Sequence, residues 1–272
     1  MEDILKVKDL HVQVRTNEGS ATLVQAISFG IKKGKILGLV GESGCGKTVT
    51  SMSILQLHDM KNVDIRGSIT LQGRELNGLA NKEMRKIRGK DIAFIMQNPM
   101  NAFTPVFTIG HQFIETIQSH TGLNKKQAKE LAIGVMESVN LPDPAKLLKN
   151  YPFQLSGGML QRVMIAIAAC LEPAVIIADE PTTALDLHSQ SLVLHLLDKI
   201  RSEYGTSILL ISHDLGVISE LADDVIVMRN GRIVETANVF ELFDKPQHEY
   251  TKKLLKTRPT LYSQKQPYTN ML

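Results

Sequence analysis

The stretch "GESGCGKT", residues 41–48, decides the fold of this chain. It matches the pattern G-x-x-x-x-G-K-[ST] and lies between the apolar run "ILGLV" (36–40) and the helical pattern "KTVTSMSILQL" (47–57). A glycine-rich turn from a strand into a helix lets backbone N–H groups surround phosphate oxygens, and the positive end of the helix dipole adds to the attraction. The sequence therefore predicts a phosphate-binding loop.

The parts of this loop have separate expected roles. Lys47 is expected to reach the β- and γ-phosphates of a nucleotide, and the Thr48 hydroxyl is expected to bind Mg²⁺. Cys45 stands at a variable position of the pattern and is interpreted as a small space-filling residue. The predicted nucleotide contacts of the loop are Gly41, Glu42, Ser43, Gly44, Cys45, Gly46, Lys47, Thr48 and Val49.

A second motif, "VIIADE" (175–180), supplies two carboxylates at the end of a short apolar run. A carboxylate pair at the end of a buried strand is unfavourable unless a cation or a proton offsets the desolvation. Asp179 is therefore expected to hold Mg²⁺ through a water, and Glu180 to polarise the water that attacks the terminal phosphate.

The remaining apolar runs indicate the fold class. "IAFIM" (92–96), "ILLI" (208–211) and "VIVM" (225–228) are short and continuous, which favours a parallel sheet covered by helices on both faces. Residues 4–14, "ISFGIKKG" (27–34) and "GSITLQG" (67–73) partly alternate and predict half-exposed strands. Between about 98 and 165 the pattern is helical, which predicts a helical insert.

Composition excludes several classes of function. The chain has 272 residues, 43% of them hydrophobic, and a net charge of +3. A nucleic-acid groove would need a denser basic stripe. Cys45 and Cys170 fit neither a metal spacing nor a disulfide framework. The charged start "MEDILKVKDL" is not expected to be a signal peptide, and no apolar run approaches the roughly 20 residues of a membrane span.

A second candidate anion site opens "LSGGMLQRVMIAIAAC" (155–170). Ser156 can cap the helix that follows, and Gly157 and Gly158 leave N–H groups open to a phosphate. An ordinary capped helix would not need two glycines in its first turn, where each adds to the entropy lost on folding. The sequence thus poses the question of why one chain carries two such turns.

With these motifs in this order, the chain resembles the ATP-binding subunits of ABC transporters. The resemblance covers residues 3–255 and leaves a short tail, 256–272. It implies a P-loop NTPase fold of the ABC type. This fold has a mainly parallel core sheet, an N-terminal antiparallel β subdomain and a helical subdomain at about 98–165. It also implies an ATPase with ATP and Mg²⁺ as cofactors.

The same resemblance assigns further residues. Gln97 matches a glutamine that contacts Mg²⁺ and faces the membrane subunit, and His213 matches a histidine that contacts the γ-phosphate. Asp186, in "TTALD" (182–186), matches an aspartate at the interface of two subunits. In the family, two ATP-binding subunits pack head to tail, and each nucleotide lies between the loop of one and the "LSGG" of the other. This arrangement explains two anion-binding turns in one chain.

The resemblance also implies partners and a location. They are a second ATP-binding subunit, as a paralogue or an identical copy, two transmembrane permeases and, indirectly, an extracytoplasmic solute-binding protein. No nucleic acid is expected, and the chain is expected at the cytoplasmic face of the cell membrane as a peripheral subunit. "PQHEYTKKLL" (246–255) and Met159, where glutamine is commoner, point to the importer branch for peptides and nickel.

Two questions of function stay open at this point. "SGGMLQR" with "MIAIA" favours import of nickel or metal chelates, with a di- or oligopeptide importer as the alternative. From a different class, a soluble ABC-type ATPase is a competing interpretation, although such chains usually carry two cassettes or a coiled coil. The family usually stacks adenine on an N-terminal aromatic, whereas this chain has Val14 there, with His11 nearby.

Overall fold

The computed structural model describes residues 2–16, 19–58 and 62–256. Its core is a six-stranded sheet in the order β10-β9-β3-β8-β7-β6, in which all neighbours are parallel except β10 and β9. The strands are β3 (Ile36–Val40), β6 (Ile92–Ile95), β7 (Val175–Asp179), β8 (Ser207–Ile211), β9 (Asp224–Arg229) and β10 (Arg232–Asn238).

The inner strands of this sheet are buried on both faces, as their continuous apolar runs predict. Every residue of β3, β7 and β8 is buried. Alternate residues enter two hydrophobic clusters: Ile36, Ile176 and Ile208 face one cluster, and Leu37, Ile177 and Leu209 face the other. The core sheet therefore has a packed layer on each side.

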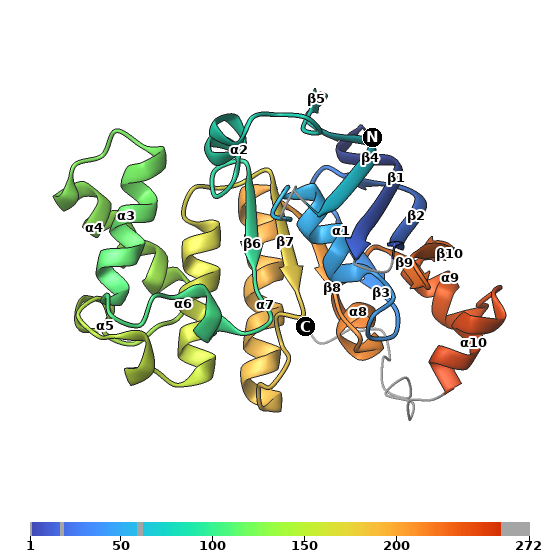
Figure 1. Ribbon diagram of the computed structural model, residues 1–272. Coiled ribbons are helices and arrows are strands. Elements are labelled where there is room, and N and C mark those ends of the chain that lie inside the picture. Colours follow the sequence, from blue (N-terminus) through green and yellow to red (C-terminus); the bar gives the residue numbers. More distant parts are fainter. Residues whose placement is uncertain (1, 17–18, 59–61, 257–272) are drawn as a thin grey trace.

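One of these layers is a second, antiparallel sheet in the order β2-β1-β4-β5. Leu5, Val7 and Ile69 of this sheet share the cluster that contains Leu37 and Leu39 of the core sheet. Figure 1 shows these strands beside α1 (Lys47–Ile54), and Ile54 of α1 enters the same cluster. The strands are β1 (Asp3–Thr16), β2 (Gly19–Lys32), β4 (Val63–Leu71) and β5 (Arg74–Glu75).

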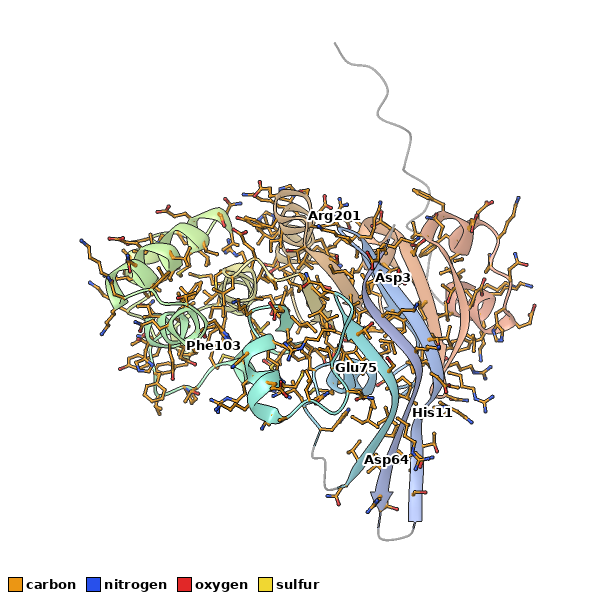
Figure 2. The ribbon with its side chains drawn as sticks, turned by 90° about the horizontal axis from the view of Figure 1, so that it is seen from above. Asp3, His11, Asp64, Glu75, Phe103 and Arg201 are labelled. Atoms are coloured by element: carbon orange, nitrogen blue, oxygen red, sulfur yellow. The ribbon has the colours of Figure 1, made fainter. Side chains whose placement is uncertain are left out.

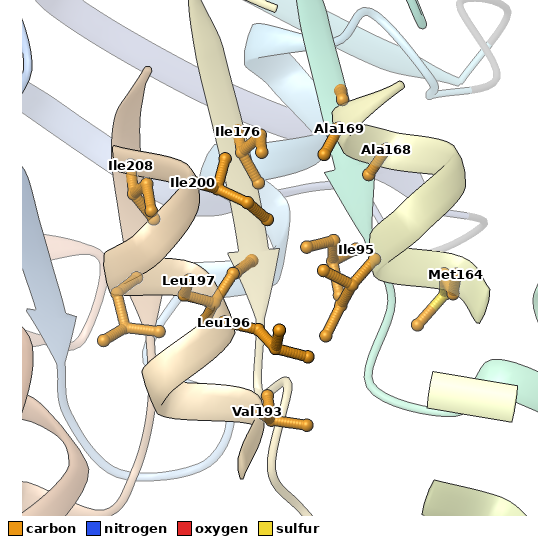
Figure 3. Close-up of a cluster of buried hydrophobic side chains, with 14 of the residues drawn as sticks. Ile95, Met164, Ala168, Ala169, Ile176, Val193, Leu196, Leu197, Ile200 and Ile208 are labelled. Atoms are coloured by element: carbon orange, nitrogen blue, oxygen red, sulfur yellow. The ribbon is translucent and has the colours of Figure 1, made fainter. Parts of the chain in front are cut away.

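The other layer consists of helices. Figure 3 shows Leu197 and Ile200 of α7 beside Ile176 of β7, and Ala168 and Met164 of α6 belong to the same cluster. The α-helices are α1 (Lys47–Ile54), α2 (Asn81–Ile87), α3 (Ile109–His120), α4 (Lys125–Ser138), α5 (Pro144–Leu147), α6 (Gly157–Ala169), α7 (Leu187–Tyr204), α8 (Leu215–Leu221), α9 (Val239–Asp244) and α10 (Glu249–Lys256). Two short 3-10 helices are η1 (Pro99–Ala102) and η2 (Pro152–Gln154).

The arrangement is elongated. Helices α3, α4 and α5 lie at one end of the molecule and α9 and α10 at the other, with the core sheet between them (Figure 1). Between β6 and β7 the chain forms only helices and loops. The fold class predicted from the sequence is confirmed. Residues 257–272, which make up all but the first residue of the expected tail, lie outside the described residues.

Candidate nucleotide site

The glycine-rich loop joins β3 to α1, as predicted. Gly46 precedes α1 with a φ of 111°, a conformation that residues with a side chain rarely adopt, and a Cβ there would lie 2.8 Å from Met228 Cε. No side chain caps the first turn of α1. The backbone N–H groups at this helix start are therefore not bound by a capping side chain. They can donate hydrogen bonds to an anion.

Lys47 is held by its own loop. Its side chain is buried, and Nζ donates to the carbonyl oxygens of Gly41 at 2.8 Å and Glu42 at 3.1 Å. These carbonyls hold the ammonium group at the centre of the loop, where phosphate oxygens could replace them. Cys45 Sγ lies 4.0 Å from Lys47 Nζ. Burial raises the pKa of the Cys45 thiol, so it stays neutral and fills space.

Asp179 ends β7 beside the loop. Its side chain is 6% exposed, and it accepts a hydrogen bond from the Thr48 hydroxyl. Burial raises the pKa of Asp179 and the adjacent Glu180 raises it further, whereas Thr48 and Lys47 oppose the shift. A carboxylate that is desolvated in this way gains most from a cation at its oxygens.

Glu180 is the centre of a hydrogen-bonded cluster. Its backbone has a φ of 50°, and its N–H donates to the Ile211 carbonyl at 2.9 Å. A single carboxylate oxygen, Oε2, lies 3.1 Å from Gln97 Nε2, 2.9 Å from Thr183 Oγ1 and 2.9 Å from His213 Nδ1. Three segments of the chain thus meet on one oxygen atom.

Three of these four residues were predicted as site residues, and the structure brings all three together. Gln97 follows β6, Glu180 follows β7 and His213 follows β8, and these strands are neighbours in the sheet. Thr183 was missed by sequence reasoning. Its signal was its position three residues after Glu180, where a turn can return the hydroxyl to the carboxylate.

The second candidate anion-binding turn has the predicted helix cap. Ser156 is exposed and caps α6, because its Oγ accepts a hydrogen bond from the Met159 N–H at 3.3 Å. Gly157 is exposed, and a Cβ on Gly158 would lie 3.0 Å from Ser189 Oγ. The start of α6 therefore lies directly against the start of α7.

Asp186 caps α7 at this same place. Oδ1 accepts from the Ser189 N–H at 2.9 Å and Oδ2 from the Ser189 hydroxyl at 2.7 Å. These hydrogen bonds hold the pKa of Asp186 below its ordinary value, so the exposed cap is charged. Ser189 is the second residue that sequence reasoning missed, although its position three residues after Asp186 is typical of a helix cap.

The structure thus forms two separate groups from the predicted residues. The loop, Asp179, Glu180, Gln97 and His213 surround the carboxyl ends of β3, β6, β7 and β8. Ser156, Gly157, Gly158 and Asp186 form an exposed pair of helix starts. Figure 1 shows α1 and α6 on opposite sides of β6 and β7.

The expected adenine region lies on the antiparallel sheet. Val14 is half-buried in β1, between Ala21 of β2 and Val63 of β4. His11 Nε2 lies 3.2 Å from Asp9 Oδ1. Figure 2 shows His11 and Asp64 on the part of this sheet that projects away from the helices, whereas Phe103 lies on the helical side.

The geometry is that of a nucleotide-hydrolysing cassette, and the comparison with known families agrees. Residues 24–183 match the family model described as ABC transporter. The chain belongs to the ABC transporter family and is one of its ATP-hydrolysing subunits.

Two relatives from Bacillus subtilis (strain 168) bear on the class of transported substrate. The dipeptide transport ATP-binding protein DppD is 44% identical over 264 residues, which are 96% of this chain and 78% of DppD. The oligopeptide transport ATP-binding protein OppD is 43% identical over 261 residues, 96% of this chain and 73% of OppD. These names favour the peptide alternative over the nickel interpretation.

Solved structures show the same fold. The ATP-binding cassette MJ0796, in a dimeric post-hydrolysis state bound to ADP and Pi, superimposes with a TM-score of 0.77. The two chains are 25% identical, and the match covers 86% of this chain and 98% of MJ0796. CbiO1 from Clostridium perfringens, part of the ABC transporter complex CbiONQ, has a TM-score of 0.76 at 24% identity and covers 90% of this chain and 92% of its own.

In the part of the chain that the structure describes, no helix has both the length and the apolar character needed to cross a membrane.

Proposed function

We propose that this chain is the ATP-hydrolysing, energy-coupling subunit of a membrane importer for di- or oligopeptides. The observation that supports hydrolysis is the cluster of side chains on Glu180 Oε2. Glu180 directly follows Asp179, the last residue of β7. The peptide class is supported by the names of DppD and OppD, each of which matches 96% of this chain.

The phosphates of ATP would be held by residues 41–49. Lys47 would exchange the Gly41 and Glu42 carbonyls, at 2.8 and 3.1 Å, for phosphate oxygens. The N–H groups at the start of α1 would point to the same phosphates. Because Lys47 is already buried at this place, little rearrangement is needed.

The residues at Thr48 and Asp179 fit a magnesium ion. A hydroxyl and a buried carboxylate are oxygen ligands of the kind that Mg²⁺ prefers, and burial raises the pKa of Asp179 despite the attraction of Lys47. We assign Thr48, Asp179 and Gln97 to the ion. When bound, Mg²⁺ would neutralise charge on the phosphates of ATP.

Glu180 is proposed as the group that polarises the attacking water. Its Oε2 is contacted by Gln97, Thr183 and His213, and in this proposal one of them moves aside so that a water can bind this oxygen. The His213 side chain is 47% exposed, so solvent and a nucleotide can reach it. Contact of His213 with the γ-phosphate would free Glu180 for the water.

The exposed group of Ser156, Gly157, Gly158 and Asp186 is proposed to bind the γ-phosphate held by a second ATP-binding subunit. The dimeric state of MJ0796 supports a paired arrangement. In this proposal the subunit is a paralogue or an identical copy, and a single chain contains two half-sites.

The permeases are proposed to dock on the helical side. A groove of about 800 Å³ there is lined by Met96, Phe103, Phe107 and Met164, among others. Val106, beside it, is 72% exposed. Two transmembrane permeases would place this chain at the cytoplasmic face of the cell membrane, and a solute-binding protein would deliver the peptide outside.

Reconstitution tests this proposal. The chain would be placed in proteoliposomes with the permeases, the second ATPase and the solute-binding protein encoded beside it. We expect tri- and tetrapeptides to stimulate ATP hydrolysis and Ni²⁺ to have no effect. Stimulation by Ni²⁺ without stimulation by peptides would overturn the peptide assignment, and absence of hydrolysis would overturn the whole proposal.

A further inference from the structure

The C-terminal helix α10 contacts the phosphate-binding loop through one side chain. Tyr250 is 4% exposed, and its hydroxyl oxygen accepts a hydrogen bond from the Glu42 N–H at 3.1 Å. The two residues are 208 positions apart in the sequence. Glu42 is the second residue of the loop, so this bond fixes the point at which the chain leaves β3.

The same Glu42 residue holds the centre of the loop. Its carbonyl oxygen accepts from Lys47 Nζ at 3.1 Å and from the Cys45 N–H at 3.3 Å. Tyr250 therefore holds Glu42 through its N–H, while Lys47 and Cys45 bind its carbonyl group. A shift of Glu42 would move the carbonyl that positions the Lys47 ammonium group.

The Tyr250 ring is itself fixed. It packs in the cluster of the core sheet, and the Arg229 guanidinium carbon lies 4.8 Å from its centroid. Burial raises the pKa of the Tyr250 hydroxyl, so the group is neutral at physiological pH and remains a hydrogen-bonding partner. The hydroxyl is thus held rigidly at the loop.

Glu235 of β10 anchors the turn that carries Tyr250. Its two carboxylate oxygens accept from the Gln247 N–H at 2.7 Å and the His248 N–H at 3.0 Å. His248 Nδ1 accepts from the Tyr250 N–H at 3.1 Å. These bonds, donated by backbone N–H groups of "PQHEYT" (246–251), hold the start of α10 against β10.

We propose that Tyr250 is a positioning residue for the phosphate-binding loop, and that α10 is part of the framework of the nucleotide site. The inference rests on the proposed function, because it concerns the same loop. In this proposal the Tyr250 hydroxyl, and not only its ring, sets the nucleotide affinity through Glu42 and Lys47.

The test removes only the hydroxyl. We expect Tyr250→Phe in the full chain to weaken binding of MgADP roughly three- to tenfold, the loss expected for one neutral hydrogen bond. ADP carries the phosphates that the loop would hold and needs no contact from a second subunit. In the assembled transporter the KM for ATP should rise by the same factor, with kcat nearly unchanged.

Two control variants separate positioning from stability. Tyr204→Phe removes a hydroxyl from a side chain that is 42% exposed at the end of α7, and should leave affinity unchanged. Val239→Ala truncates a buried residue of α9 and should lower the Tm without changing the affinity. Tyr250→Phe should show the opposite result, a weaker affinity with a Tm close to that of the wild type.

The outcomes are distinct. Wild-type affinity in Tyr250→Phe would overturn the inference, and so would a fall in Tm together with a loss of affinity in both Tyr250→Phe and Val239→Ala. Failure of the wild-type chain itself to bind MgADP would instead contradict the proposed function.

Discussion

His213 Nδ1 lies 2.9 Å from Glu180 Oε2, so the residue at the end of β8 closes over the carboxylate at the end of β7. In this arrangement the carboxylate oxygen is occupied by protein donors. We expect a bound nucleotide to draw some of these donors away from Oε2. The carboxylate then becomes available to water at the same time as the γ-phosphate is in place.

Glu180→Gln tests the role of this carboxylate. An amide cannot take a proton from water, so we expect kcat to fall by about a hundredfold or more. Binding of ATP should be retained, because the loop is unchanged. ATPase rates and ATP affinity measured on the same preparation check this. Hydrolysis near the wild-type rate would show that another group acts as the base.

Lys47→Ala tests the phosphate contact. The variant loses a buried ammonium group that now bonds to the Gly41 and Glu42 carbonyls at 2.8 and 3.1 Å. Because hydrogen bonds to charged groups contribute about 1.5–3 kcal/mol, we expect the affinity for ATP to fall at least about tenfold. Isothermal titration measures this fall. Full affinity in the variant would contradict the assignment of the loop.

Asp179→Asn tests whether the buried Asp179 carboxylate lowers the stability of the nucleotide-free protein. Burial and Glu180 raise the pKa of Asp179, so without nucleotide its ionised form disfavours the folded state. The penalty is absent below the unfolded pKa of about 3.9, grows as the pH rises from that value through the folded pKa, and is constant above it. The variant should therefore be more stable than the wild type at pH 7, by about 2–4 °C for each kcal/mol removed.

This gain should shrink as the pH falls towards about 4 and disappear below it, where both states of the wild type bind the proton. Thermal unfolding of the nucleotide-free proteins at several pH values gives the comparison. The variant should also bind MgATP more weakly. A lower Tm than that of the wild type at pH 7 would contradict the account of Asp179.

The sequence predicted the buried strands well, for a physical reason. β3 has the predicted bounds, and β7, β8 and β9 extend the predicted runs by one or two residues, because strands buried on both faces must be continuously apolar. β10 was missed because its residues are exposed or half-buried, unlike most of those of β6 at the other edge of the sheet. Its sequence "RIVETAN" shows no clear alternation.

The individual site residues were predicted more completely than their grouping. Gln97, Glu180 and His213 could each be found from the motif order, but their meeting on one oxygen depends on the strand order of the folded sheet. Thr183 and Ser189 act through hydrogen bonds three residues away, which motif spacing alone did not single out. Tyr250 lay in a recognised string, but only the fold shows that it contacts Glu42.

The central claim is that a nucleotide on the loop of one subunit is completed by the exposed turn at Ser156 of another. Its most direct test uses Ser156→Arg, which places a bulky charge at the start of α6 without burying it. Ser202→Arg, at an exposed position near the end of α7, is the matched control. Both changes are made in a Glu180→Gln background.

The measurement is the mass of the ATP-binding subunits in solution, by light scattering after gel filtration with MgATP. The account predicts an ATP-dependent pair for Glu180→Gln alone and with Ser202→Arg, but separate subunits with Ser156→Arg. The Ser156→Arg protein should unfold at the same temperature as its control. An ATP-dependent pair that forms equally well with Ser156→Arg would contradict the shared site.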